Sequence, residues 1–217
     1  MKSALKFISQ LSDNNNKEWF DGHKKEYDLA KKEFIVLVDS VIKSCSRFDP
    51  ELTGLDASKT LFRINRDVRF SKDKSPYKTN FGASINPGGK SSMIPGYYIH
   101  VQPGQSFLAG GCYMPMPDYL SAIRQEIDYN TPEFKKIIQH KDFVQYFKTL
   151  DAEDKLKTAP KGYEKDHPEI DLLKYKSYVV MHRLSDKQLN SADFPDYCTK
   201  VFKAMFPLLL FLRRTKQ

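Results

Sequence analysis

A stretch of twenty residues, 59–78, carries most of the chain's candidate chemistry. It reads KTLFRINRDVRFSKDKSPYK and holds seven basic residues against two acidic ones. It therefore supplies a surplus of five positive charges to the formal net charge of +8 of the 217 residues. Guanidinium groups bind phosphate or carboxylate through paired, charge-assisted hydrogen bonds, so this density predicts an oxyanion site. The candidate anion-binding residues are Arg63, Arg66, Arg69, Lys72, Lys74 and Lys78.

Three other side chains could add acid–base chemistry to such a site. Asp67 lies among the arginines, where it can neutralise one of them and fix its orientation. Tyr77 offers a hydroxyl group at the end of the same stretch. The unperturbed pKa of a histidine such as His100 allows proton transfer near neutral pH. We therefore take Asp67, Tyr77 and His100 as candidate catalytic residues, with His100 or Asp67 as the general base.

Three interpretations of this stretch remain open at the level of sequence. The first is a hydrolase or transferase that acts on a phosphorylated substrate, with the arginines stabilising developing charge. The second is a binding module for nucleic acid or a nucleotide, in which Phe70, Tyr77 and Tyr98 stack on bases. The third is purely structural, with Arg66 and Asp67 as a buried ion pair. Whether the protein is an enzyme is therefore left undecided.

The sequence specifies no cofactor. It contains no glycine-rich phosphate loop and no dinucleotide-binding fingerprint. The spacings of its histidines and acidic residues match no metal-ligand pattern, so we predict no metal site.

Alternating residue patterns predict the strands that position these groups. Even positions of 60–70 are mostly apolar and odd positions mostly polar, which is typical of a strand with one buried face. Similar alternation covers 79–85, 97–101 and 107–113, and residues 175–181 are a fifth candidate strand. Short connections between them predict an antiparallel meander. Its polar face would carry Arg63, Asn65, Asp67, Arg69, Asn80, Ser84, Tyr98 and His100.

Helical periodicity flanks this predicted sheet on both sides. Apolar residues recur at helical spacing in 3–42, with Asn16 as a helix cap, and again in much of 118–212. Pro207 is expected to kink or divide the last helix. The predicted class is α+β, with one domain at 1–217, a core sheet at about 59–113, and helices on the apolar face. The charged face would be open to a ligand.

The overall composition narrows the class of protein. With 40% hydrophobic and 29% charged residues, the chain resembles a soluble globular protein. Lys6, Lys203 and Pro207 interrupt the apolar terminal segments, so we expect neither a signal peptide nor a membrane span. Three cysteines without a C-x-x-C spacing favour a reducing cytoplasm. The positive charge favours an anionic partner, either a phosphate-containing small molecule or a nucleic acid, and leaves the oligomeric state unspecified.

The basic stretch also carries a family resemblance. Its pattern RxxRDxRFxxDKxxY at 63–77 resembles the signature of the family called domain of unknown function 2461. Three further blocks are similar to that family: NNNKEWF at 14–20, GYYIHVQPGQSFLAGG at 96–111 and PKGYEKDHPEIDLLKYKS at 160–177. The resemblance covers essentially the whole chain and implies a single-domain fold. It implies no activity, because the family has none assigned.

Overall fold

The central element is a four-stranded antiparallel sheet, seen in a computed structural model that describes residues 1–215. Its strands lie in sequence order, and the register pairs Ala83 with Ile99 and Ile99 with Leu108. The predicted α+β class and meander are confirmed, with four strands rather than about five. The strands are β1 (Phe81–Ile85), β2 (Gly96–Val101), β3 (Phe107–Cys112) and β4 (Tyr178–Arg183).

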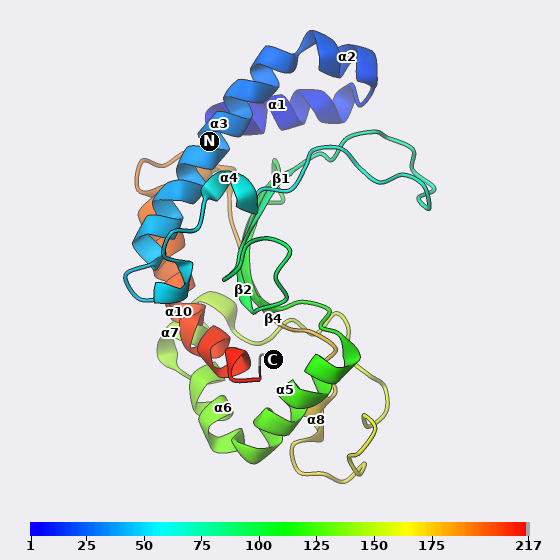
Figure 1. The fold of residues 1–217 in the computed structure, drawn as a ribbon, viewed down its shortest axis with the longest axis vertical. Coiled ribbons are helices and arrows are strands. Elements are labelled where there is room, and N and C mark those ends of the chain that lie inside the picture. Colours follow the sequence, from blue (N-terminus) through cyan, green and yellow to red (C-terminus); the bar gives the residue numbers. More distant parts are fainter. Residues whose placement is uncertain (216–217) are drawn as a thin grey trace.

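One face of the sheet is covered by helices and the other is not. Ala83, Ile99, Leu108 and Val180 point to the covered face and are fully buried. Helix α3 (Lys24–Cys45) contacts β1 and helix α10 (Phe194–Arg213) contacts β3, and both lie on the left of the sheet in Figure 1. The alternation that made these strands recognisable in the sequence therefore also separates a core face from an open one.

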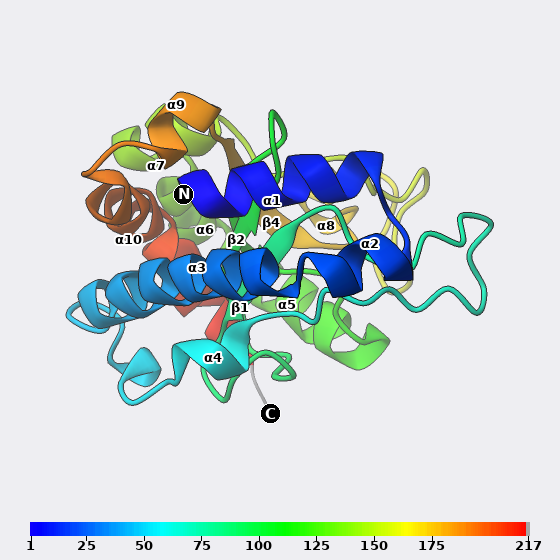
Figure 2. The same ribbon diagram turned by 90° about the horizontal axis from the view of Figure 1, so that it is seen from above.

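The helices surround the sheet at both ends and on one side (Figures 1 and 2). The Asn16 side chain caps α2 by accepting a hydrogen bond of 2.9 Å from the backbone N–H of Trp19, as predicted. No helix within residues 1–215 is long and apolar enough to cross a membrane. Besides α3 and α10, the helices are α1 (Lys2–Asp13), α2 (Lys17–Gly22), η1 (Pro50–Leu52), α4 (Ala57–Thr60), α5 (Pro117–Tyr129), α6 (Thr131–Ile138), α7 (Lys141–Phe147), α8 (Ile170–Leu173) and α9 (Asp186–Leu189).

Two sequence-based predictions about secondary structure need correction. Residues 60–70 are not a strand of the sheet, because only Leu61 pairs with β1, through a single bridge to Ala83. The sheet therefore begins at Phe81 and is completed by β4, instead of spanning 59–113. Pro207 does not divide the last helix, which continues through it as α10. Buried residues on both sides of Pro207 keep that helix packed although one backbone donor is missing.

A buried ion pair joins the segment after α3 to the end of α10. Asp49 accepts two hydrogen bonds from the Arg213 guanidinium, at 2.8 and 2.9 Å, and the Tyr97 hydroxyl donates a third at 3.0 Å. Arg213 also donates from Nε to the carbonyl oxygen of Pro95 at 2.8 Å. This network anchors α10 to β2 and to the segment after α3.

Candidate functional site

Residues 63–78 form a hairpin that projects from the body of the protein, and we call it the basic hairpin. Figures 1 and 2 show it leaving the sheet region near α4 and β1 and extending beyond the helices. At its base the Lys78 N–H donates to the Ile64 carbonyl at 2.7 Å, and the Arg66 N–H donates to the Pro76 carbonyl at 2.9 Å. Ile64 is buried, whereas Phe70 at the tip is 96% exposed. The apolar alternation in this stretch therefore anchors only the base of the hairpin.

The two carboxylates of the hairpin pair with different arginines from those that the sequence suggested. Arg66 pairs with Asp73 rather than with its neighbour Asp67, and its side chain remains 25% exposed. Asp73 also accepts from the hydroxyl and the backbone N–H of Ser75, at 2.6 and 2.9 Å. These two bonds and the Arg66 guanidinium lower the pKa of Asp73 to about 2. The proposed buried pair of Arg66 with Asp67 is therefore absent.

Asp67 instead holds Arg69 in a two-point interaction at the surface. Arg69 donates from Nε to Oδ1 at 2.9 Å and from Nη2 to Oδ2 at 2.7 Å. The bonds from Arg69 lower the pKa of Asp67, and the same carboxylate raises the pKa of Arg69. The charge of Arg69 is thus compensated within the hairpin.

The other cations of the hairpin have no carboxylate partner. Arg63 and Lys72 form no hydrogen bond or ion pair with any residue of the described chain, and the Lys74 ammonium donates only to the Val68 carbonyl, at 2.9 Å. The Lys78 ammonium lies 5.3 Å from the centre of the Phe62 ring. Burial and the nearby charge of Arg63 lower the pKa of Lys78. Four of the six predicted anion-binding residues therefore lack a carboxylate counterion among residues 1–215.

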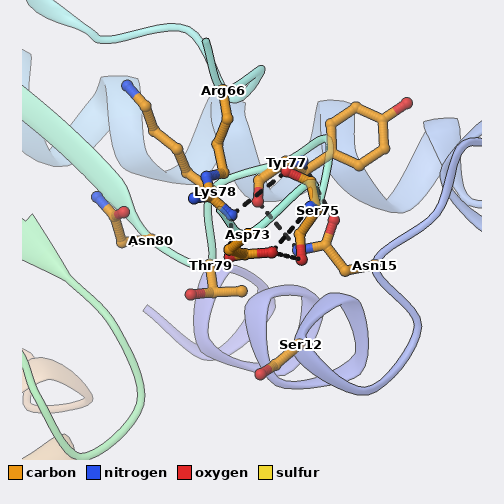
Figure 3. Close-up of a pocket in the computed structure, with 9 residues that line it drawn as sticks. All are labelled: Ser12, Asn15, Arg66, Asp73, Ser75, Tyr77, Lys78, Thr79 and Asn80. Carbon is orange, nitrogen blue, oxygen red and sulfur yellow. Dashed lines mark hydrogen bonds and ion pairs between the residues drawn. The ribbon is translucent and has the colours of Figure 1, made fainter. Parts of the chain in front are cut away.

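A small polar pocket of about 340 Å³ lies at the base of the hairpin (Figure 3). The Asn15 side chain closes one side of it by pairing with the backbone of Tyr77: it donates to the carbonyl at 2.9 Å and accepts from the N–H at 3.1 Å. The residues that line the pocket are Ser12, Asn15, Arg66, Asp73, Ser75, Tyr77, Lys78, Thr79 and Asn80.

The Tyr77 hydroxyl points away from this pocket in Figure 3. The Tyr77 ring stacks on Phe20 with a centroid distance of 4.1 Å and an interplanar angle of 16°. Burial, followed by the charge of Asp21, raises the pKa of its hydroxyl. The structure therefore uses Tyr77 to dock the hairpin on the helical part of the protein.

His100 lies on the open face of the sheet and not on the hairpin. Its Nε2 is 3.0 Å from Gln102 Oε1, so Nε2–H donates and Nδ1 accepts from the Tyr98 hydroxyl at 3.2 Å. The ring also stacks on Phe107, with centroids 4.5 Å apart. Burial lowers the pKa of His100 despite the hydrogen bond to Gln102. Within residues 1–215 no contact joins His100 to Asp67, so the two candidate bases do not form one catalytic group.

Asn15 and Phe62 are the main site residues that chemical reasoning from the sequence missed. Asn15 belongs to the block at 14–20 that resembles the family, and this was the available signal. The alternation at 60–70 predicts that Phe62 lies on the buried face of a strand, but in the structure it is half-exposed beside Lys78.

Comparison with known proteins identifies a family for the chain, but no individual curated protein or solved structure that matches it. A family model described as "Conserved hypothetical protein (DUF2461)" matches residues 3–211. A search of curated proteins found no match, and neither did a search of solved structures.

Proposed function

We propose that this chain, which belongs to the DUF2461 family of conserved hypothetical proteins, binds the phosphate backbone of a nucleic acid through its basic hairpin. The description of the family names no activity. The observation that carries this proposal is the division of the hairpin's charges. Arg66 and Arg69 are held by Asp73 and Asp67, whereas Arg63 and Lys72 have no anionic partner within residues 1–215. Like charges gathered without a counterion favour an external polyanion.

The exposed aromatic ring at the tip supports a nucleic acid over an isolated phosphate. Phe70 is 96% exposed, and the Arg69 guanidinium carbon lies 5.8 Å from its ring centre. That one cation leaves most of the ring exposed to water, and a nucleobase can stack on the exposed surface. Because the hairpin projects from the body (Figure 2), both the ring and the cations can reach an extended ligand.

The candidate acid–base groups support binding over catalysis. Asp67 is occupied by Arg69 and has a lowered pKa, so it is a weak base. Both ring nitrogens of His100 already have polar partners on the sheet. We therefore assign the basic hairpin a binding role and assign no reaction to it.

The test is the affinity of the full-length protein for a short, fluorescein-labelled single-stranded RNA of mixed sequence, measured by fluorescence anisotropy. Phe70→Ala should weaken binding about tenfold, because stacking on one base contributes about 1–3 kcal/mol. The double change Arg63→Gln and Lys72→Gln should weaken binding further, since it removes two charges without disturbing the ion pairs of the hairpin.

Matched controls lie on helices outside the hairpin. Lys187→Gln with Lys203→Gln removes two exposed charges from α9 and α10, which lie on the side away from the hairpin in Figure 2, and Tyr129→Ala removes an exposed ring from α5. These controls should bind RNA as the wild type does. Wild-type protein that fails to bind, or hairpin variants that bind as tightly as wild type, would remove the basis of the proposal.

A further inference from the structure

The open face of the sheet holds a second and larger cavity, of about 630 Å³. The cavity exists because open-face positions of the central strands carry small residues, which leave space above the sheet. Gly96 and Gly111 pair across β2 and β3, and Ala109 is the next open-face residue on β3. Val179 and Met181 of β4 continue the floor. The volume is that of a site for a small organic ligand, and the flat floor suits a planar one.

Aromatic side chains form much of the wall of this sheet cavity. Phe62 meets Tyr98 edge-on with centroids 6.2 Å apart, and Tyr98 lies 5.8 Å from Phe107. Phe62, Met93 and Tyr113 are exposed large apolar side chains, and all three line the cavity. Exposed apolar groups gathered around one hollow mark a binding surface rather than ordinary surface scatter.

The two ends of the sheet cavity carry opposite charge. At the β1 edge, Lys90 donates to the Leu61 carbonyl at 3.0 Å, and it retains two N–H donors. At the β4 edge, the Asp151 N–H is bonded to the Val179 carbonyl at 2.9 Å, which places the Asp151 and Glu153 side chains over the far end. No ion pair within residues 1–215 involves either carboxylate, and Asp151 Oδ1 accepts one hydrogen bond of 3.1 Å from the Glu153 N–H. A ligand that fits has an anionic group at one end and N–H donors at the other.

The sheet cavity adjoins the basic hairpin. The Lys78 ammonium lies over the ring of Phe62, which lines the cavity. Asn80, beside the hairpin pocket, approaches His100 of the cavity at 3.5 Å. In Figure 1 the hairpin projects on the side of the sheet opposite α3 and α10. A strand bound along the hairpin can therefore direct a base onto the sheet.

We infer that the sheet cavity binds one nucleotide of a single-stranded nucleic acid, with its phosphate towards Lys78 and Lys90 and its base over Ala109. Guanine fits best, because its neighbouring N1–H and N2–H donors can reach both oxygens of one carboxylate of Asp151 or Glu153. The inference rests on the proposed function for its ligand class. It adds a preference for single strands and a preference among bases, neither of which the basic hairpin supplies.

Titration of the full-length protein with 5′-GMP and with 5′-UMP by isothermal calorimetry tests the sheet cavity separately from the hairpin. We expect GMP to bind at least about tenfold more tightly than UMP, since one satisfied two-point contact discriminates by about 1–3 kcal/mol. Ala109→Phe, which fills the floor, should abolish GMP binding. Asp151→Asn with Glu153→Gln should remove the preference for GMP and keep the fold, because Asp151 is half-buried and Glu153 exposed, and an asparagine oxygen can still accept from the Glu153 N–H.

The outcomes separate the two proposals. The sheet-cavity inference is wrong if GMP and UMP do not bind, or bind equally, and folded Ala109→Phe protein keeps its affinity for RNA. In that case the hairpin can still bind RNA. If GMP binds and Ala109→Phe abolishes this, yet RNA does not bind, the proposed hairpin function fails and the cavity stands. Circular dichroism and the melting temperature establish that Ala109→Phe is folded, and the double carboxylate variant gives an independent reading.

Discussion

At the scale of single residues, the most deeply buried ion pair within residues 1–215 lies away from the basic hairpin. Asp49 and Arg213 have 1% and 2% exposed side chains, and they are bonded to each other as well as to Tyr97 and Pro95. Two charges removed from water require such complete pairing, because each alone would cost several kcal/mol. Burial, followed by the charge of Asp49, raises the pKa of Tyr97, so its hydroxyl stays a hydrogen-bond donor.

Arg213→Met should therefore lower the free energy of unfolding by about 3–5 kcal/mol, because it leaves the Asp49 carboxylate buried and unpaired. The neighbouring change Arg214→Met is the matched control. Arg214 pairs with Glu133 at the surface, at 2.7 Å, and should contribute about 1 kcal/mol or less. Urea unfolding of both variants measures the difference, and equal losses would show that the buried pair is not the anchor of α10.

His100 should titrate below the ordinary histidine pKa of 6.5, because burial disfavours its charged form. The unfolded chain then binds the proton first, so the contribution of His100 to stability is present above pH 6.5 and is lost as the pH falls through the folded pKa. Two-dimensional NMR of the ring measures the midpoint directly. His100→Gln should also flatten the loss of stability between about pH 7 and pH 5. A midpoint at or above 6.5 would contradict the neutral hydrogen-bonded ring.

At the scale of elements, the basic hairpin depends on a contact with a distant helical turn. The side chain of Asn15, between α1 and α2, forms hydrogen bonds with the carbonyl and the N–H of Tyr77, as the backbone of a neighbouring strand would. Phe20 supports the same residue through ring stacking. The hairpin backbone contributes few cross-strand bonds of its own, so its base is fixed largely by these contacts.

Asn15→Ala should therefore cost about 1–3 kcal/mol, because it leaves two backbone groups of Tyr77 without partners. Amide hydrogen exchange at Tyr77 and Lys78 should accelerate, and limited proteolysis should cut the hairpin more readily. Asn14→Ala is the control, since the Asn14 side chain bonds only to the Gln10 carbonyl at an exposed position. Unchanged exchange at the hairpin base in Asn15→Ala would mean that Phe20 alone holds it.

At the scale of the whole molecule, the net charge of +8 is unevenly distributed. Six basic residues and two acidic ones lie within residues 63–78, and four of these cations have no carboxylate partner within residues 1–215. The hairpin that carries them projects on the side of the sheet opposite α3 and α10 (Figure 1). The fold thus places an extended basic element beside an aromatic cavity. Such a distribution concentrates the electrostatic attraction for a polyanion at one edge of the protein.

Affinity for single-stranded RNA should fall with salt with a slope, in log–log form, of about −3 if Arg63, Lys72, Lys74 and Lys78 each neutralise one phosphate. Arg63→Gln with Lys72→Gln should reduce the magnitude of that slope by about 1.4, at about 0.7 per phosphate. The Lys187→Gln and Lys203→Gln control should leave it unchanged. A slope that is the same in the hairpin variant would place the bound phosphates elsewhere on the molecule.

The elements whose signals are local could be predicted from the amino-acid sequence. Alternation located β1 to β3 within about two residues and indicated β4, and helical periodicity and Asn16 identified the N-terminal helices. The density of basic residues at 63–78 also identified the charged element. These features depend on side-chain periodicity and composition, which neighbouring residues carry without reference to the rest of the chain.

The way in which these elements pair and pack follows from long-range contacts in the folded chain. The alternation at 60–70 satisfies the pattern of a strand, yet its pairing with β1 consists of the bridge between Leu61 and Ala83 and the bond from the Phe62 N–H to the Gly82 carbonyl. Residues 63–78 turn outward as the hairpin (Figure 1). Arg66 selects Asp73 over the adjacent Asp67 because the hairpin turn brings residues 66 and 73 together. Asp49 and Arg213 meet although 164 positions separate them. Pairing across such distances depends on chain closure and burial, which no local pattern encodes.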